Sequence, residues 1–94
     1  MNAQGQLIQL ATGEYDWILL RFEAHPGDPR DEVEATVWLH YADGATDPEW
    51  LRRPAGADSC RIPVPRHTAL AALRLPELPS LRISEITPLE VSRV

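Results

Sequence analysis

Nucleophilic chemistry at a cysteine is the first activity to consider, because the sequence contains a single cysteine, Cys60, together with His40 and His67. A thiolate acts as a nucleophile when a nearby imidazole lowers its pKa. No flanking motif supports such a pair, and Cys60 begins an apolar segment, where an unpaired cysteine is usually a small buried hydrophobic residue. We therefore expect no catalytic residue and a non-enzymatic protein. A small enzyme that uses Cys60 or the loop at His25 is kept as an alternative.

Metal binding is the second possibility, because ligand-type side chains gather in a short polar segment. The segment contains one histidine and three acids, His25, Asp28, Asp31 and Glu32. Structural zinc sites need four ligands rich in cysteine and histidine, and calcium loops need regularly spaced oxygen ligands around a glycine turn. The segment matches neither pattern. It predicts an exposed acidic loop shaped by its two prolines, with no metal and no cofactor.

Basic side chains suggest a third kind of site, because an arginine cluster can hold phosphate or an acidic partner. All nine basic residues are arginines, a composition typical of GC-rich bacterial or phage genomes. The candidate cluster consists of Arg52, Arg53, Arg61 and Arg66. Acids lie between these arginines and no glycine-rich phosphate loop is present, which favours scattered surface charges. The net charge of −5 also disfavours direct binding of nucleic acid.

Acidic side chains dominate the first half of the chain. Residues 1–47 contain nine acids and two arginines, whereas residues 48–94 contain five acids and seven arginines. We expect the first half to face a protein partner with a basic surface. The candidate contact residues are Asp28, Asp31, Glu32 and Glu34. As an alternative, these acids would suit an inhibitor of the anti-defence type, which occupies a nucleic-acid-binding groove of a target complex.

Large apolar side chains are the remaining candidates for a binding surface. Trp17, Leu19 and Trp38 fall on the faces of their expected strands that lie opposite the expected core residues. They would either fill a second core layer beneath a helix or form an exposed patch on the sheet. Such a patch would bind a protein or a second copy of this chain, as in a homodimer. The leading expectation is a non-enzymatic protein-protein interaction domain, a small accessory protein of a bacterium or phage.

The elements that position these side chains are mostly short strands. The clearest pattern lies at residues 33–41, where apolar and polar residues alternate over nine positions. Residues 6–12 and 17–24 predict two strands joined by a turn, which together form a hairpin. Further strands are expected at residues 60–64, 81–84 and 89–92. The last two are separated by an apparent bulge and can form one long bent strand.

Two short helices are expected between these strands. Asp47 is a typical helix N-cap, and Pro54 limits the helix that follows it to fewer than two turns. Thr68 caps a second helix, which ends before Pro76. Pro63 cannot donate a ladder hydrogen bond, which places its strand at a sheet edge.

These elements predict an α+β fold, with a mainly antiparallel sheet or small open barrel of five to six strands and two short helices. A length of 94 residues is typical of one domain, so residues 1–94 are expected to form a single domain. Leu20, Phe22, Val37 and Leu39 are the expected core.

The cell compartment is expected to be the cytoplasm. A single cysteine cannot form an internal disulfide, and no basic stretch followed by an apolar signal core is present at the N-terminus. The apolar runs, such as residues 17–20 and 69–73, are far shorter than the ~20 residues that cross a bilayer, so no membrane insertion is expected.

Overall fold

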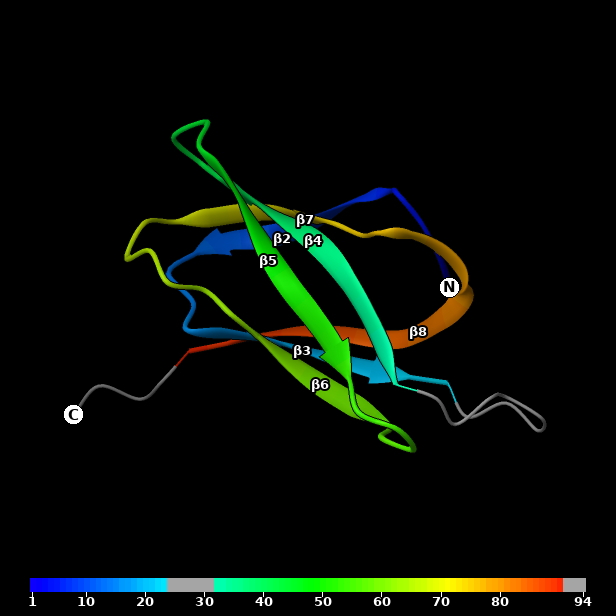
Figure 1. Ribbon diagram of the computed structural model, residues 1–94. Helices are drawn as coiled ribbons and strands as arrows, with labels where there is room; N and C mark the ends of the chain where they lie inside the picture. The colour runs from blue at the N-terminus through cyan, green and yellow to red at the C-terminus, as the bar shows by residue number, and fades with distance from the viewer. Residues whose placement is uncertain (24–31, 91–94) are drawn as a thin grey trace.

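The computed structural model describes residues 1–23 and 32–90, and every regular element within them is a strand. Two four-stranded sheets with antiparallel pairing pack face to face as a sandwich (Figure 1). The first sheet contains, in spatial order, β1 (Asn2–Gln4), β8 (Glu77–Leu89), β3 (Trp17–Phe22) and β6 (Ser59–Pro63). The second sheet contains, in spatial order, β2 (Leu7–Gly13), β7 (Leu70–Arg74), β4 (Val33–Tyr41) and β5 (Thr46–Arg53). The predicted α+β class is therefore wrong for the described residues, which form an all-β fold.

The core lies between the two sheets and is made by alternate residues of their strands. The central strands β3 and β4 contribute the buried side chains Ile18, Leu20, Phe22, Val37, Leu39 and Tyr41. Leu20, Val37 and Leu39 have no exposed surface and Phe22 is 6% exposed, which confirms the predicted core. The strand predicted at residues 33–41 is also confirmed as β4, because its period of two is what a strand with one buried face requires.

The first predicted helix, which was expected to begin at Asp47, is instead strand β5. It pairs antiparallel with β4 over eight consecutive residues, from Val33 opposite Arg53 to His40 opposite Thr46. Asp47 and Pro48 are compatible with a helix start. The complete ladder with β4 and the burial of Leu51 in the core stabilise the strand more than these capping residues would stabilise a short helix. Pro48 is tolerated because β5 is an edge strand.

The second predicted helix, which was expected to follow Thr68, is strand β7. Its alanine, leucine and arginine residues favour helix intrinsically, but a helix ended by Pro76 would be too short to be stable alone. As a strand, the same residues pair with β2 on one side and β4 on the other. Leu70 and Leu73 are completely buried there, so tertiary packing overrides local propensity.

The predicted hairpin of residues 6–12 and 17–24 is not formed. The two segments become β2 and β3, which belong to different sheets, so the turn between them joins one layer to the other. Of the two segments expected near the C-terminus, residues 81–84 lie in β8, which has a register irregularity opposite Arg21 and Phe22. β8 already begins at Glu77 and ends at Leu89, and residues 91 and 92 lie outside the described residues. β6, which contains Pro63, lies at an edge as predicted.

One corner of the sandwich is formed by two chain segments that pass together from sheet to sheet. The connection between β1 and β2 turns at Gly5, which has a φ of 76°, in the region that favours glycine. Beside it runs the connection between β7 and β8, and the Gly5 amide donates to the Pro76 carbonyl over 3.2 Å. The Leu75 amide donates to the Gln6 carbonyl over 3.0 Å, so the ladder continues around the corner.

Candidate functional site

The outward side of the second sheet carries a row of apolar side chains around one arginine. Trp38 on β4 lies opposite Pro48 on β5 and opposite Arg74 on β7. Arg74 in turn lies opposite Leu7 on the edge strand β2. These four residues therefore form one straight row across all four strands, because directly opposed residues of a sheet share a face.

A second tryptophan lies in the adjacent row. Trp50 on β5 is opposite Thr36, which makes it a diagonal neighbour of Trp38 at a Cα separation of roughly 7 to 8 Å. Trp50 is 56% exposed, Trp38 41% and Leu7 38%. We call the outward surface formed by Leu7, Trp38, Pro48, Trp50 and Arg74 the aromatic face.

Sequence reasoning missed Trp50 because the helix expected after Asp47 gave it no fixed relation to Trp38. The alternation of side chains along a strand could have revealed Trp50. If residues 46–53 are read as a strand, Pro48, Trp50 and Arg52 share one face.

Charged groups border the aromatic face at the end near Trp50. The Arg52 guanidinium lies 5.9 Å from the centre of the Trp50 ring and its Nε donates to Glu32 Oε1. Glu34 lies opposite Arg52 in the β4–β5 register. The two described acids of the predicted acidic surface are thus beside one arginine, on the same sheet as Trp38. Asp28 and Asp31 lie outside the described residues.

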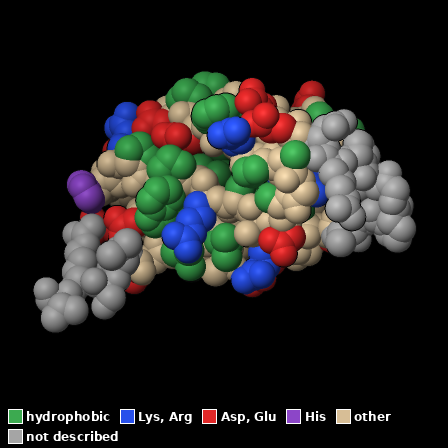
Figure 2. Space-filling model, turned by 60° about the horizontal axis from the view of Figure 1, so that its bottom comes forward, with side chains coloured by type: hydrophobic (Ala, Val, Ile, Leu, Met, Phe, Trp, Pro, Cys, Tyr) green, Lys and Arg blue, Asp and Glu red, His purple; other side chains and the backbone are tan. Residues whose placement is uncertain are grey.

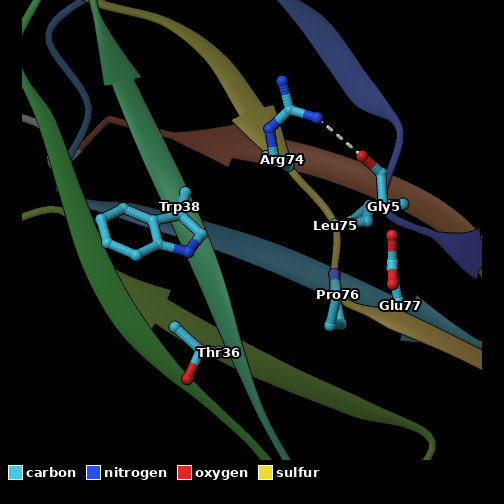
Figure 3. A pocket seen from close by; sticks show the side chains of 7 residues that line it. All are labelled: Gly5, Thr36, Trp38, Arg74, Leu75, Pro76 and Glu77. Atoms are coloured by element: carbon cyan, nitrogen blue, oxygen red, sulfur yellow. Dashed lines mark hydrogen bonds between the residues drawn. The ribbon is translucent and has the colours of Figure 1, made fainter.

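A pocket of about 380 Å³ lies beside Trp38, where the second sheet bends into the corner (Figure 3). Its lining residues are Gly5, Thr36, Trp38, Arg74, Leu75, Pro76 and Glu77. Arg74 Nη1 donates to the Gly5 carbonyl over 2.9 Å, which holds the guanidinium on the pocket rim. A Cβ atom added at Gly5 would lie 2.9 Å from Glu77 Cγ, so this side of the pocket depends on a residue without a side chain.

Trp17 and Leu19 lie on the outward side of the first sheet, away from Trp38. Trp17 is opposite Pro63 on β6 and Leu89 on β8, and it is 38% exposed. Figure 2, turned so that the lower side of Figure 1 comes forward, shows hydrophobic side chains interspersed with arginines and acids. The structure therefore does not bring the predicted residues Trp17, Leu19 and Trp38 into one patch. Within residues 1–23 and 32–90 no helix covers Trp17 or Trp38, so neither lies in a second core layer of that kind.

The candidate nucleophile Cys60 and the candidate base His40 are also in different layers, and the other candidate base, His67, lies in the connection between β6 and β7. Cys60 lies on β6, opposite Leu20, and burial raises the pKa of its thiol to about 11. His40 lies on the outward side of β4 in the second sheet. A raised pKa keeps the thiol protonated near neutral pH, the opposite of what an activated cysteine requires.

The four arginines of the predicted basic cluster make separate contacts. Arg52 binds Glu32, and Arg66 binds Asp47 through two nitrogens. Arg53 lies over the Phe22 ring at 5.3 Å and donates to the Ala57 carbonyl. Arg61 lies opposite Leu19 in the other sheet. These contacts give no convergent anion site.

Metal ligands do not converge in the part of the chain that the structure describes, where no group of three histidine, cysteine or acidic side chains is suitably placed. Glu32 is the one described member of the predicted loop cluster, since His25, Asp28 and Asp31 lie outside the described residues. The same described part contains no helix with the length and apolarity to span a membrane.

No family model matches the chain, and no curated protein matches its sequence significantly.

Proposed function

We propose that this protein is a non-enzymatic protein-protein interaction domain and that the aromatic face is its contact surface. The observation that carries this proposal is the placement of Trp38 and Trp50 as diagonal neighbours on adjacent strands, where they are 41% and 56% exposed. Tryptophan is enriched among the residues that contribute most to binding energy, and folded monomers seldom leave clustered large apolar side chains uncovered.

The strands beneath the aromatic face support this role because their inward side chains are anchored in the core. The neighbours of Trp38 along β4 are Val37 and Leu39, which are completely buried. A tryptophan fixed on such a strand loses little further backbone freedom when a partner binds, which favours affinity. The raised pKa of Cys60 gives no support to the alternative of a cysteine enzyme.

The chemistry of a heterologous partner follows from charge. A net charge of −5 would steer the domain toward a partner with a basic surface, and Glu34 at the border of the aromatic face is placed to meet it. We further propose that the domain works in the cytoplasm, as an accessory protein of a bacterium or phage. The inhibitor alternative receives no separate support, because Glu32 is already paired with Arg52.

The test is affinity capture with the purified chain and with a Trp38→Ala/Trp50→Ala variant, followed by reconstitution with the purified captured protein. Trp17→Ala is the matched control, because Trp17 is exposed to a similar extent on the other sheet. We expect the double variant to lose binding and the control to keep it. Equal binding by all three proteins in calorimetry would refute the aromatic face as the contact surface.

A further inference from the structure

We propose that the partner at the aromatic face is a second copy of this chain, held in a two-fold dimer in which Trp50 of each copy enters the pocket beside Trp38 of the other. This inference rests on the proposed function, because it names the occupant of the same surface. It depends on how the rows of the second sheet map onto each other under a two-fold rotation.

The symmetry axis that suits this face runs parallel to the strands, between β4 and β7, in the plane of contact. The strand order of the second sheet is β2-β7-β4-β5, so rotation about this axis places β4 over β7 of the second copy and β5 over its β2. Each cross-strand row then faces the same row of the other copy. An isologous contact of this kind makes every interaction twice.

The row that contains Trp38 is complementary to itself under this rotation. Trp38 faces Arg74 of the partner subunit, since both residues belong to the same row. Pro48 faces Leu7 of the partner subunit. A guanidinium over an indole ring is a favourable cation–π pair, and the contact between proline and leucine covers apolar surface.

In the adjacent row, a protruding side chain at one end faces a pocket of the other copy. This row consists of Trp50 and Thr36 on β5 and β4, followed by Pro76 and Gly5, which continue β7 and β2 by two residues. Rotation therefore places Trp50, the most exposed of the described large hydrophobic residues, over Gly5 of the partner subunit. Gly5 lines the pocket of about 380 Å³, a volume within the range of pockets that hold small organic ligands, so an indole ring can enter it (Figure 3).

Charges at the rim of the pocket suit the same arrangement. Arg52 lies against the Trp50 ring, donates from its Nε to Glu32, and would carry its guanidinium with the ring toward the pocket of the second copy. Glu77 lines that pocket and is exposed. The docking thus pairs Arg52 with Glu77 of the partner subunit, once on each side of the axis.

The size of the face predicts a weak dimer. Four strands spaced ~4.8 Å apart, with about eight residues that rise ~3.3 Å each, present a surface of about 500 Å². Two such surfaces bury about 1,000 Å², at the lower limit for a specific interface and in the range of transient ones. We therefore expect monomer and dimer to exchange, and the dimer to be populated at high protein concentration.

Sedimentation equilibrium over a wide range of protein concentrations tests the proposal. We expect reversible dimerisation of the wild type, at least about tenfold weaker association for Trp50→Ala, and no change for Trp17→Ala. Circular dichroism of each variant verifies that the fold is kept. A wild type that is monomeric at every concentration, or a dimer that Trp17→Ala disrupts and Trp50→Ala does not, would overturn the proposal.

Charge reversal provides a second test that depends on the docking geometry. Arg52→Glu and Glu77→Arg should each weaken the dimer, and the double variant should restore it, because the reversed charges meet across the interface. Additive loss in the double variant would overturn this geometry. A monomeric wild type that still binds a different protein through Trp38 and Trp50 would refute the second copy as occupant while leaving the proposed function in place.

Discussion

Within each strand, one face packs into the core and the other faces outward. Phe22 on β3 belongs to the core-facing side. The ring is 6% exposed, and the guanidinium of Arg53 lies 5.3 Å from its centre. Phe22→Ala should lower the free energy of unfolding by about 3 to 5 kcal/mol, because it removes buried apolar surface and leaves a cavity. Urea denaturation measures this loss. Trp38→Ala is the comparison and should cost much less stability, and an equal loss in both variants would contradict the assignment of faces.

Alkaline pH should destabilise the protein through Cys60. Burial raises the pKa of the folded thiol from its ordinary value of 9.0 to about 11. The unfolded thiol therefore ionises first, so the stabilising contribution is complete below pH 9 and is lost as the pH rises toward 11. Burial also raises the pKa of Tyr41, which acts in the same direction.

The thermal midpoint measured from pH 7 to pH 11 checks this prediction. It should fall through the upper part of that range, and Cys60→Ala should make the fall shallower. Alkylation of the wild-type thiol by iodoacetamide near neutral pH should be slow. Rapid alkylation, or a midpoint that does not depend on pH, would show that the thiol is not held in its protonated form.

At the scale of the element, β6 shows how an edge strand is protected. The Val64 amide donates to the Asp16 carbonyl, so residues 64 and 16 form a hydrogen-bonded pair and Pro63 opposite Trp17 does not. The backbone nitrogen of Pro63 therefore points to the free edge, where proline offers no donor. Edge prolines hinder the pairing of sheets from different molecules.

Pro63→Thr restores a donor on that edge and should promote aggregation. Light scattering at elevated temperature should show an earlier onset for this variant than for the wild type. Pro65→Thr is the matched control, because Pro65 is exposed and lies outside the strand. An unchanged onset for Pro63→Thr would mean that another feature, such as the outward charges of the first sheet, prevents association at this edge.

Elements were predictable where the signal is local and strong. β4 follows from nine alternating residues, each of which agrees with a strand half-buried in a sandwich. β7 was not predictable in the same way, because the capping residue Thr68 and the helix preference of the alanines are local, whereas its pairing with β2 and β4 is set by residues distant in the sequence. β5 forms a hairpin with β4 around the turn at Gly44, which has a φ of 91°, but the capping residues Asp47 and Pro48 indicated a helix instead. The error also concealed Trp50, and with it half of the aromatic pair.

At the scale of the whole molecule, the assignment of strands to sheets decides which predicted site residues meet. Trp17 and Trp38 both alternate with buried residues, so the sequence correctly places each on an outward side. Which of the two outward sides each occupies depends on strand order, and strand order is set by non-local pairing that a single sequence does not reveal. The described part of the surface therefore has one apolar region on each sheet, at Trp17 and at Trp38.

The net charge of −5 gives the two kinds of partner opposite responses to salt. Two copies of the chain repel each other at long range, so raising the ionic strength from about 0.01 M to about 0.15 M should strengthen self-association by screening the repulsion. Binding to a basic heterologous partner should weaken over the same range. Sedimentation for the dimer and calorimetry for the heterologous complex measure the two trends, and self-association that weakens with salt would show that the Arg52–Glu77 ion pairs outweigh the net repulsion between the copies.

The pairing of β1 with β8 and of β2 with β7 determines the order in which the chain can fold. During synthesis, β1 and β2 emerge well before their partner strands β8 and β7, which lie about 60 residues or more further along the chain. Each sheet therefore lacks two of its four strands, an inner strand and the edge strand that pairs with it, until residues 70–89 have left the ribosome. Folding has to close this long loop in a late step, and a topology dominated by such distant pairs is expected to fold in milliseconds to seconds, slowly for a chain of this length.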